Sequence, residues 1–214
     1  MKDSLVKNFY EKHHVKGSRL GQSVDEKVRA DVFKNWIGTN KKVLDLGGRD
    51  GTLSSHFSPK NDITIGDADT NALNEAYRRH GLDTIEVNLN EKLPLDDCTF
   101  DVVIMGEVIE HLPYPTETLS EVTRILKQNG LFIGSLPLAY HLIDRWKVLR
   151  GKKLSISGDP SHLQFFKYEE AISLLSDFFK IDDIFHLKGG RKAKVFPNLF
   201  SRNICFKCRK ILFP

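Results

Sequence analysis

An apolar run that ends in an acid and continues into glycines, VLDLGGRDG at residues 43–51, is the feature that most constrains this chain. A parallel strand is covered on both faces and is therefore apolar along its length. The glycines that follow it, Gly47, Gly48 and Gly51, let the backbone turn tightly and approach a ligand closely. A second apolar run, ITIGD, ends in Asp67, 22 residues after the acid of the first run. An acid at about this distance is placed to accept hydrogen bonds from ribose hydroxyls, so the two runs favour a nucleotide-like ligand.

Strand and helix signals alternate along the chain. Strands are predicted near 42–46, 62–66, 84–88, 100–106 and 131–136, and helices near 24–37, 51–57, 70–79, 115–127 and 168–177. The alternation predicts an α/β fold with a doubly wound, mostly parallel sheet and its ligand-binding loops at the carboxyl ends of the strands. Residues 140–150 predict an amphipathic helix inserted after the fifth strand. The last two apolar runs, KIDDIFHL and NICFKCRK, have no full helix between them and predict a closing antiparallel hairpin.

Length and composition limit the number of domains and the kinds of partner. The 214 residues predict a single domain over 1–214, with a cap segment at 1–22 and the inserted helix within 138–157. The net charge of +4 permits a nucleic-acid partner without requiring one. Three cysteines give no disulfide framework, and no stretch has the apolar length that spans a bilayer. We therefore expect a cytoplasmic protein without a membrane partner.

Five segments, taken in order, resemble the motifs of class I S-adenosylmethionine-dependent methyltransferases of the small-molecule type. They are VLDLGGRDG, ITIGDADTNAL, VNLNEKLPLDDCTFDVVIMGEVIEHL, EVTRILKQNGLFIGSLP and HLQFFKYEEAISLL. The resemblance covers roughly residues 25–210. It implies a seven-stranded, Rossmann-like sheet with an antiparallel last strand, and S-adenosylmethionine as the cofactor. A nicotinamide dinucleotide is disfavoured, because GGRDG does not supply the G-x-G-x-x-G pattern.

The resemblance also implies which residues hold the cofactor. The implied residues are Asp45, Gly47, Gly48 and Gly51 at the methionine side, Asp67 and Ala68 at the ribose, Asn88 and Leu89 at the adenine, and Gly106 near the methyl group. Asn88 stands where the family usually has an aspartate, and its side-chain carbonyl can still accept a hydrogen bond. Arg49 stands where the family usually has a third glycine. We expect that the backbone there needs no positive φ and that the arginine points away from the cofactor or reaches over its carboxylate.

Four polar residues are candidates for chemistry at the acceptor side. Glu107, Glu110 and His111 lie within one helical turn if a helix begins at Glu107, and His162 follows in DPSHLQFF. Two carboxylates and two imidazoles can bind a divalent metal, and this set resembles that of small-RNA 3′-end 2′-O-methyltransferases. Alternatively His111 or His162, beside Glu107, acts as a catalytic general base. In the simpler interpretation Glu110 pairs locally, His111 packs beneath the sheet and His162 is a satisfied loop residue.

These observations predict a methyltransferase that acts on an oxygen or nitrogen of a small-molecule acceptor. The acceptor pocket would be built from residues 1–22, the insertion at 138–157 and the loop near His162. Two alternatives stay open. One is a metal-assisted RNA ribose 2′-O-methyltransferase, and the other is a non-catalytic methyltransferase-like binding module, for which Arg49 is the support.

Overall fold

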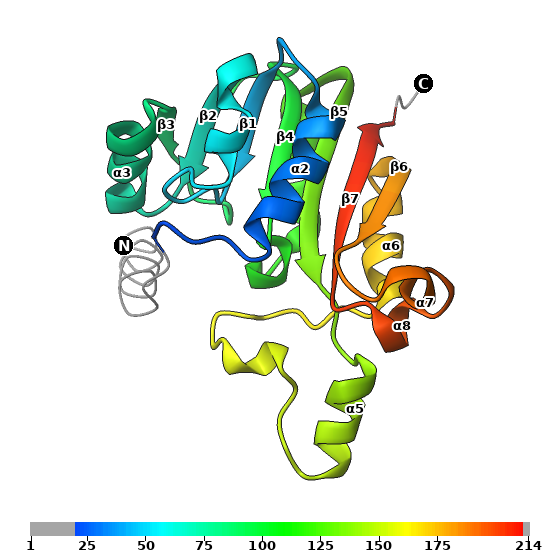
Figure 1. Cartoon of the computed structure of the whole chain (residues 1–214). Coiled ribbons are helices and arrows are strands. Elements are labelled where there is room, and N and C mark those ends of the chain that lie inside the picture. The colour runs from blue at the N-terminus through cyan, green and yellow to red at the C-terminus, as the bar shows by residue number, and fades with distance from the viewer. Residues whose placement is uncertain (1–19, 212–214) are drawn as a thin grey trace.

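The fold is built on one seven-stranded sheet, seen in a computed structural model that describes residues 20–211 (Figure 1). The strand order is β3-β2-β1-β4-β5-β7-β6. The strands are β1 (Lys42–Leu46), β2 (Asp62–Asp67), β3 (Asp83–Glu86), β4 (Phe100–Gly106), β5 (Leu126–Pro137), β6 (Phe179–His186) and β7 (Asn203–Lys210). From β1 the chain adds β2 and β3 on one side and then returns to add β4 on the other side of β1. Ligands bind at such a switch point in doubly wound sheets.

Helices cover both faces of the sheet (Figure 1). They are α2 (Glu26–Ile37), α3 (Thr70–His80), α4 (Pro115–Ile125), α5 (Leu142–Leu149), α6 (Tyr168–Ser176), α7 (Gly190–Val195) and α8 (Pro197–Phe200). Buried side chains of α2 and α3 pack on one face of the sheet, and those of α4 and α6 pack on the other. Along β4 the side chains alternate between the two cores, as Val102 and Ile104 join the first and Val103 and Met105 the second. The apolar strands predicted from the sequence are thus explained by burial on both faces.

The predicted antiparallel closure is confirmed. Strand β7 lies between β5 and β6 and pairs antiparallel with both. Its cysteines are three residues apart and point to opposite faces, as expected for a strand: Cys205 belongs to the core under α2, and Cys208 belongs to the core under α4 and α6.

Two predicted helices differ from the structure. The segment 51–57 forms no α-helix but a 3₁₀ helix, Ser54–His56, followed by a second one, Ser58–Lys60. Pro59 has no amide hydrogen and disfavours helical backbone before it, which prevents a longer helix here. The helix predicted at 115–127 ends at Ile125, and β5 begins at Leu126 instead of near 131. Leu126 pairs with Phe100 at the start of β4, and after a register shift the pairing resumes at Leu131; this irregularity has no signal in the pattern of apolar residues.

The inserted helix α5 follows β5 as predicted and lies away from the sheet, beyond its carboxyl edge (Figure 1). Most of the predicted cap at 1–22 lies outside the described residues, so this element and the extent of the single domain stay predictions. Among the described helices, none has the length and apolar character needed to cross a membrane.

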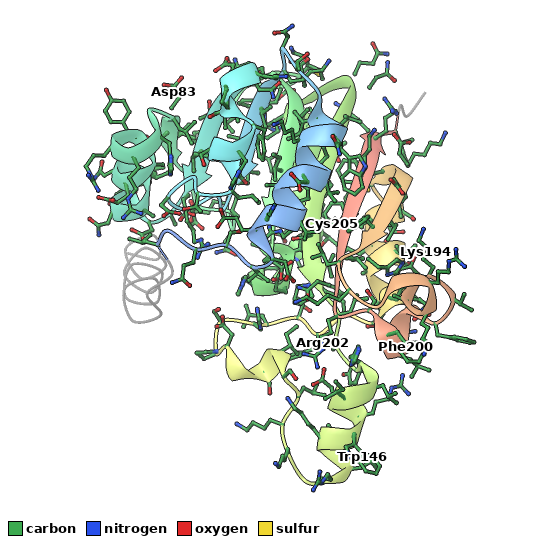
Figure 2. All side chains as sticks on the ribbon, viewed as in Figure 1. Asp83, Trp146, Lys194, Phe200, Arg202 and Cys205 are labelled. Atoms are coloured by element: carbon green, nitrogen blue, oxygen red, sulfur yellow. The ribbon has the colours of Figure 1, made fainter. Side chains whose placement is uncertain are left out.

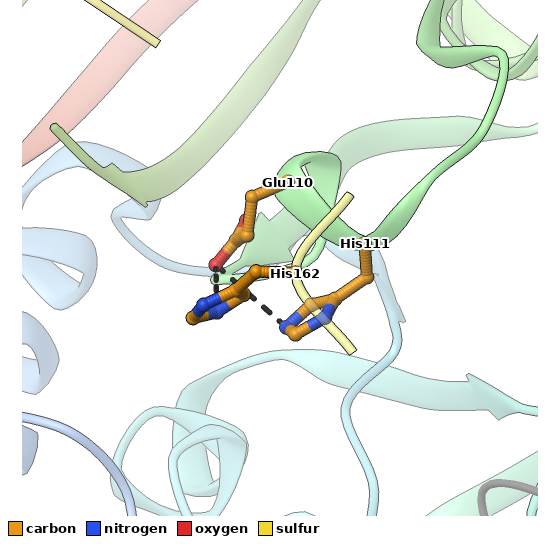
Figure 3. A group of neighbouring side chains, drawn as sticks. All are labelled: Glu110, His111 and His162. Carbon is orange, nitrogen blue, oxygen red and sulfur yellow. Dashed lines mark ion pairs between the residues drawn. The ribbon is translucent and has the colours of Figure 1, made fainter. Parts of the chain in front are cut away.

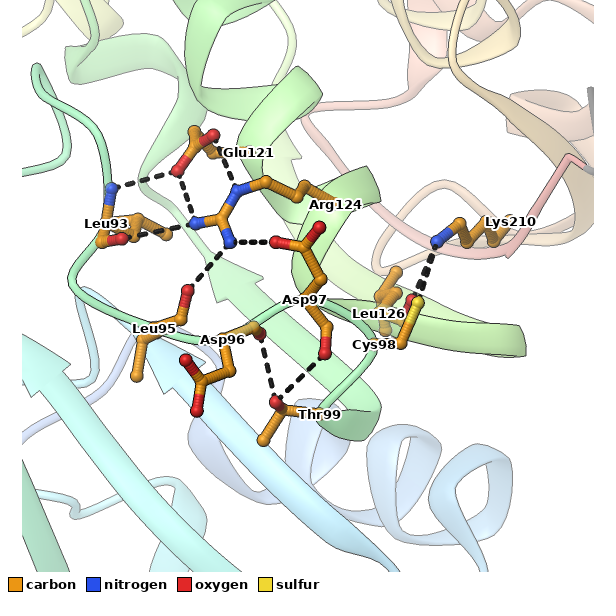
Figure 4. Close-up of polar contacts among 10 residues, drawn as sticks. All are labelled: Leu93, Leu95, Asp96, Asp97, Cys98, Thr99, Glu121, Arg124, Leu126 and Lys210. Carbon is orange, nitrogen blue, oxygen red and sulfur yellow. Dashed lines mark hydrogen bonds and ion pairs between the residues drawn. The ribbon is translucent and has the colours of Figure 1, made fainter.

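Arg124, near the end of α4, holds the long connection between β3 and β4 in place (Figure 4). Its guanidinium donates to the carbonyl oxygens of Leu93 and Leu95, to the carboxylate of Asp97 and to both oxygens of Glu121. Glu121 in turn accepts from the backbone amide of Leu93 at 2.9 Å. One planar side chain thereby satisfies two carbonyls of a segment that has no regular structure.

Candidate active site

A cavity of about 570 Å³ lies at the carboxyl edge of the sheet, where the ends of β1, β2 and β4 meet. This volume is within the range of small-molecule sites, roughly 300–1,000 Å³. Of the predicted cofactor residues, the cavity is lined by Asp45, Gly47, Gly48, Asp67, Ala68, Asn88, Leu89 and Gly106. The predicted acceptor-side residues Glu107, Glu110, His111 and His162 line the same cavity. Both halves of the predicted site therefore share one space.

The glycine turn after β1 lies against the side chains beneath it. Gly47 has φ of 74°, a conformation that glycine adopts without strain, and its backbone amide donates to the Gly66 carbonyl at 2.7 Å. A Cβ on Gly47 would lie 2.6 Å from Val108, and a Cβ on Gly48 would lie 2.7 Å from the Asp45 carboxylate. Without a side chain at these two glycines, the backbone of the turn packs directly against Val108 and Asp45 beside the cavity.

Gly51 has a different role from the one expected. It is not among the residues that line the cavity, and a Cβ there would lie 2.6 Å from the Leu82 side chain in the core. Its φ of 68° again suits glycine. Gly51 therefore shapes the turn from behind the cavity wall.

Asp45 is a buried carboxyl group at the floor of the cavity. Its Oδ2 accepts a hydrogen bond of 2.6 Å from Ser54 Oγ. Burial raises the pKa of Asp45 from 3.8 to about 6, although the Ser54 hydrogen bond and the Arg29 charge oppose this shift.

Asp67, at the end of β2, is almost fully buried and organises the loop that faces it. Its two carboxylate oxygens accept the backbone amides of Arg49 and Asp69, at 3.0 Å and 2.9 Å. Each carboxylate oxygen can accept more than one hydrogen bond, so the cavity-lining carboxylate still has acceptor capacity for a ribose hydroxyl.

The expectation that Arg49 needs no positive φ is wrong: its φ is 51°. The left-handed backbone is that of the glycine which the family usually has at this place, and the hydrogen bond from the Arg49 amide to Asp67 stabilises it. The Arg49 guanidinium donates to the Gln22 carbonyl at 2.6 Å, so the side chain reaches across to the segment before α2.

The adenine side of the predicted site is tied to α4. Asn88 and Leu89 follow β3 and line the cavity. Thr118 Oγ1 of α4 donates to the Leu89 carbonyl at 2.8 Å, and Asn88 Oδ1 accepts from the Asn90 amide at 3.1 Å. The Asn88 side-chain oxygen thus accepts a hydrogen bond within its own loop, and its hydrogen bond to an adenine amine stays a prediction.

Glu110, His111 and His162 form a compact group at the acceptor side of the cavity (Figure 3). A 3₁₀ helix, Ile109–His111, follows β4 and presents the first two side chains. The loop with His162 is held beside them, because the amides of Leu163 and Gln164 both donate to the Glu110 carbonyl at 2.9 Å. The two histidine rings lie 4.6 Å apart, and their Nε2 atoms lie 3.8 Å and 3.9 Å from Glu110 Oε1.

The electrostatics of this group are unusual. Glu110 is fully buried, and neither of its carboxylate oxygens has a hydrogen-bond partner among the described residues. Burial, and then the charge of Glu107, raise the pKa of Glu110 well above its usual range. His111 Nδ1 lies 3.0 Å from the Ser161 carbonyl and His162 Nδ1 lies 2.7 Å from the Ile156 carbonyl. Since a carbonyl only accepts, each Nδ1 carries a proton, and Nε2 is the ring nitrogen that faces Glu110.

Glu107 does not join this group, so the predicted convergence of four side chains holds for three. Its oxygens accept hydrogen bonds from Ser135 Oγ at 2.7 Å and from Asn203 Nδ2 at 2.9 Å. The backbone at Glu107 has φ of 60° and does not begin the helical turn that the sequence argument assumed. Glu107 still lines the cavity, near the end of β4.

Arg29 is a cavity residue that the sequence argument missed. It is only 2% exposed, and its guanidinium fills the place where a Cβ of Gly106 would lie. Its Nη1 donates to Ser23 Oγ and to the Val24 carbonyl, both at 3.2 Å, while its Nε has no partner in the described part of the chain. The signal was its spacing: Arg29, Phe33 and Ile37 are four residues apart on the buried face of α2.

The acceptor side also contains residues without an earlier signal. They are Asp144, Ser155, Ile156, Asp159, Ser161, Arg202 and Asn203. The inserted segment therefore contributes to the cavity as predicted, through Asp144 and Ser155, while Arg202 and Asn203 come from the start of β7.

Part of the chain matches a known domain, and the fold is shared with solved proteins. Residues 44–134 match the family model described as a methyltransferase domain. Solved structures with the same fold include a SAM-dependent methyltransferase from Methanosarcina mazei, with a TM-score of 0.65 at 17% identity over 85% of this chain and 98% of the other. The CurJ carbon methyltransferase has a TM-score of 0.69 at 14% identity over 95% of this chain and 60% of the other. Residues 44–134 thus match a methyltransferase domain, and the chain shares the fold of these solved methyltransferases.

Two curated relatives are methyltransferases of quinone biosynthesis. The ubiquinone biosynthesis O-methyltransferase of Pasteurella multocida is 31% identical over 45% of this chain and 46% of its own length. The ubiquinone/menaquinone biosynthesis C-methyltransferase UbiE of Desulfotalea psychrophila is 36% identical over 48% of this chain and 44% of its own length. The matches cover less than half of each of these two relatives, and they differ in the atom that is methylated.

Proposed function

We propose that this protein transfers the methyl group of S-adenosylmethionine to an oxygen or nitrogen of a small-molecule acceptor. The observation that carries the proposal is the single cavity that joins the glycine turn and Asp67 to the Glu110, His111 and His162 group. The cofactor half fits the nucleoside and methionine parts, since it offers a buried carboxylate, an amide oxygen and a close backbone turn.

The protein's own part in such a reaction is mainly alignment. A sulfonium methyl group is already a strong electrophile, so the barrier falls when donor and acceptor are held in line. The histidines add a further role if the acceptor is a hydroxyl. An Nε2 lone pair at the acceptor side can take the hydroxyl proton as the oxygen attacks, which favours oxygen over nitrogen as the acceptor.

Calorimetry with S-adenosylhomocysteine tests the cofactor half of the proposal. We expect heat of binding and a rise in melting temperature; no binding at millimolar ligand would reject the proposal. Transfer of a labelled methyl group to a panel of phenols, catechols, carboxylic acids and amines then tests the reaction. Binding without transfer to any acceptor would favour the binding-module alternative.

A divalent metal at Glu110, His111 and His162 is the second candidate, and a specific observation favours it. One potential ligand atom from each residue lies within 4.8 Å of the others. Both histidines donate through Nδ1 to backbone carbonyls, which is the arrangement that orients metal-binding histidines. The unpartnered oxygens of Glu110 would gain a ligand role. A metal bound there would polarise an acceptor hydroxyl and lower its pKa.

The two roles of the histidines predict different results. If a metal is required, a chelator stops methyl transfer, and Zn²⁺ or Mn²⁺ binds the apo-protein but not the Glu110→Gln variant. If one histidine is a general base, a chelator has no effect on methyl transfer. An RNA with a free 3′-terminal ribose belongs in the same panel, because its methylation would favour the RNA alternative over a small molecule.

A further inference from the structure

The inserted helix α5 turns its apolar side outward. Leu142, Ile143, Trp146 and Leu149 are all exposed, with Trp146 at 63% and Leu149 at 78%. At 100° per residue these four side chains lie on one face of the helix. The buried residue of α5 is Asp144, on the opposite side, where Val148 is exposed as well. A surface helix ordinarily buries its apolar stripe and exposes its charges, so this orientation is the reverse of the usual one.

Contacts on the protein side fix the helix in this orientation. The Asp144 carboxylate accepts hydrogen bonds from both the amide and the hydroxyl of Ser155. Lys147 Nζ donates to the same hydroxyl at 2.7 Å. A rotation of α5 that buried Trp146 would break these bonds and leave Asp144 without them.

Exposed apolar side chains also occur on the neighbouring helices α7 and α8. Helix α5 contacts α8, and exposed Val195 and Phe196 lie at the junction of α7 and α8. Figure 2 shows Trp146 on α5 and Lys194 and Phe200 around α7 and α8 at this end of the molecule. We name the surface formed by α5, α7 and α8 the insertion face.

The segments that form the insertion face are rich in basic residues, although Lys188 pairs with Asp25 and Glu169 of α6 lies against Asn198 of α8. Residues 138–158 and 187–202 together contain ten lysines and arginines and a single acid, the buried Asp144. The basic residues are Arg145, Lys147, Arg150, Lys152, Lys153, Lys188, Arg191, Lys192, Lys194 and Arg202. The net charge of the whole chain is only +4, so the positive charge is concentrated on these two segments.

We propose that the insertion face docks on an anionic lipid bilayer, with the apolar side of α5 in the headgroup layer. An anionic bilayer offers an apolar layer for the exposed side chains of α5 and negative charge for the basic residues around them. Trp and aliphatic side chains enter the boundary between headgroups and acyl chains, and the surrounding lysines and arginines attract acidic headgroups. This is peripheral attachment; the earlier expectation of no membrane partner rested on the absence of a spanning segment and does not bear on it.

Docking would orient the cavity as well as the protein. Asp144, Ser155 and Arg202 belong to the segments of the insertion face and also line the acceptor side of the cavity. Because Asp144 lines the cavity from the side of α5 opposite Trp146, the bilayer would lie across α5 from the acceptor side of the cavity.

Flotation of the full chain with lipid vesicles tests the proposal. We expect the protein to float with vesicles of mixed phosphatidylglycerol and phosphatidylcholine, and at least tenfold less with pure phosphatidylcholine or in high salt. Trp146→Ser combined with Leu149→Ser should reduce flotation at least tenfold. The matched control is Tyr77→Ser on α3, which removes an equally exposed aromatic residue (68%) on another helix and should float as the unsubstituted chain does.

Fluorescence gives an independent readout, because the chain has two tryptophans. In a Trp36→Phe variant the emission comes from Trp146 alone. We expect a blue shift with anionic vesicles and quenching by lipids brominated on the acyl chain.

Three results would overturn the proposal. They are no flotation with anionic vesicles, equal flotation of the Trp146 and Leu149 double variant, and a dimer in sedimentation that the double variant converts to monomer without any vesicle binding. The last result would identify the face as a contact between two copies of the chain. None of these measurements requires methyl transfer, so failure here is distinguishable from failure of the proposed function.

Discussion

At the scale of single residues, Asp67 is expected to contribute more to cofactor affinity than any other side chain of the cavity. It is a charged acceptor at the predicted ribose position. Asp67→Ala should weaken S-adenosylhomocysteine binding by about 1.5–3 kcal/mol, the scale of hydrogen bonds to a charged group. Calorimetry measures this directly; affinity within twofold of the unsubstituted protein would contradict the assignment.

A control is needed because Asp67 also accepts the amides of Arg49 and Asp69. Urea unfolding of both proteins without ligand gives the stability that the loop loses. Asn88→Ala is a useful comparison, since its side chain lines the cavity at the predicted adenine end. It should weaken binding less than Asp67→Ala, because an uncharged hydrogen bond contributes about 0.5–1.5 kcal/mol.

Asp45 predicts a pH dependence of folding stability. The pKa of Asp45 is 3.8 for an exposed carboxyl, as in the unfolded chain, and about 6 in the folded protein. As pH rises, the unfolded chain therefore releases this proton before the folded protein does. The carboxyl of Asp45 therefore lowers stability progressively as pH rises from 3.8 to about 6, and by a constant amount above that. Two pKa units correspond to about 3 kcal/mol. Asp45→Asn, neutral at every pH, should gain stability over the unsubstituted chain by about this amount between pH 4 and pH 7; parallel urea-unfolding curves against pH would refute it.

The cofactor residues were predictable because each lies at a strand end that the apolar pattern defines. Asp45 lies one residue before the end of β1, and Asp67 is the last residue of β2. The positive φ of Arg49 was not predictable, because it depends on a hydrogen bond to the distant Asp67. The orientation of Glu107 was not predictable either, because its partners Ser135 and Asn203 are distant in sequence. Arg29 was missed because one charged residue on a buried helix face does not break an amphipathic pattern.

At the scale of secondary-structure elements, the bonds of Arg124 hold α4 to the β3–β4 connection. Arg124→Lys keeps the charge but replaces a five-donor planar group with a single nitrogen, so the carbonyls of Leu93 and Leu95 cannot both be satisfied. We expect the free energy of unfolding to fall by about 1–2 kcal/mol, measured in urea. Arg78→Lys, whose partner Glu75 lies on the surface of α3, should show no measurable change. Equal effects of the two substitutions would contradict the role given to Arg124.

Strand positions were easier to predict than helix ends. The apolar runs of β1, β2 and β4 are bounded by charges and glycines, and the structure keeps those bounds within one residue. The start of β5 was misplaced because residues 126–130, LKQNG, are too polar to signal a strand. Only Leu126 pairs with β4 before a bulge, and backbone pairing leaves no trace in side-chain hydropathy.

At the scale of the whole molecule, the two cores predict the reactivity of the cysteines. Cys98 is exposed, whereas Cys205 and Cys208 are buried on opposite faces of β7. Burial raises the pKa of Cys205 to about 12 and that of Cys208 further. An aromatic disulfide reagent at pH 8 should therefore modify one thiol rapidly in the folded protein and all three in urea. Rapid modification of two or three thiols under native conditions would show that β7 is not held between β5 and β6.

The position of β7 also has a consequence for biosynthesis. Strand β6 leaves the ribosome before β7, yet its one neighbour in the sheet is β7. Until residues 203–210 emerge, the edge of β5 and the whole of β6 have unpaired backbone groups. The nascent chain can order β1 to β5 during translation, but the sheet closes only after the last of its strands is released. A stop codon within β7 would therefore leave an incomplete sheet with two exposed strand edges, a substrate for chaperones and proteases.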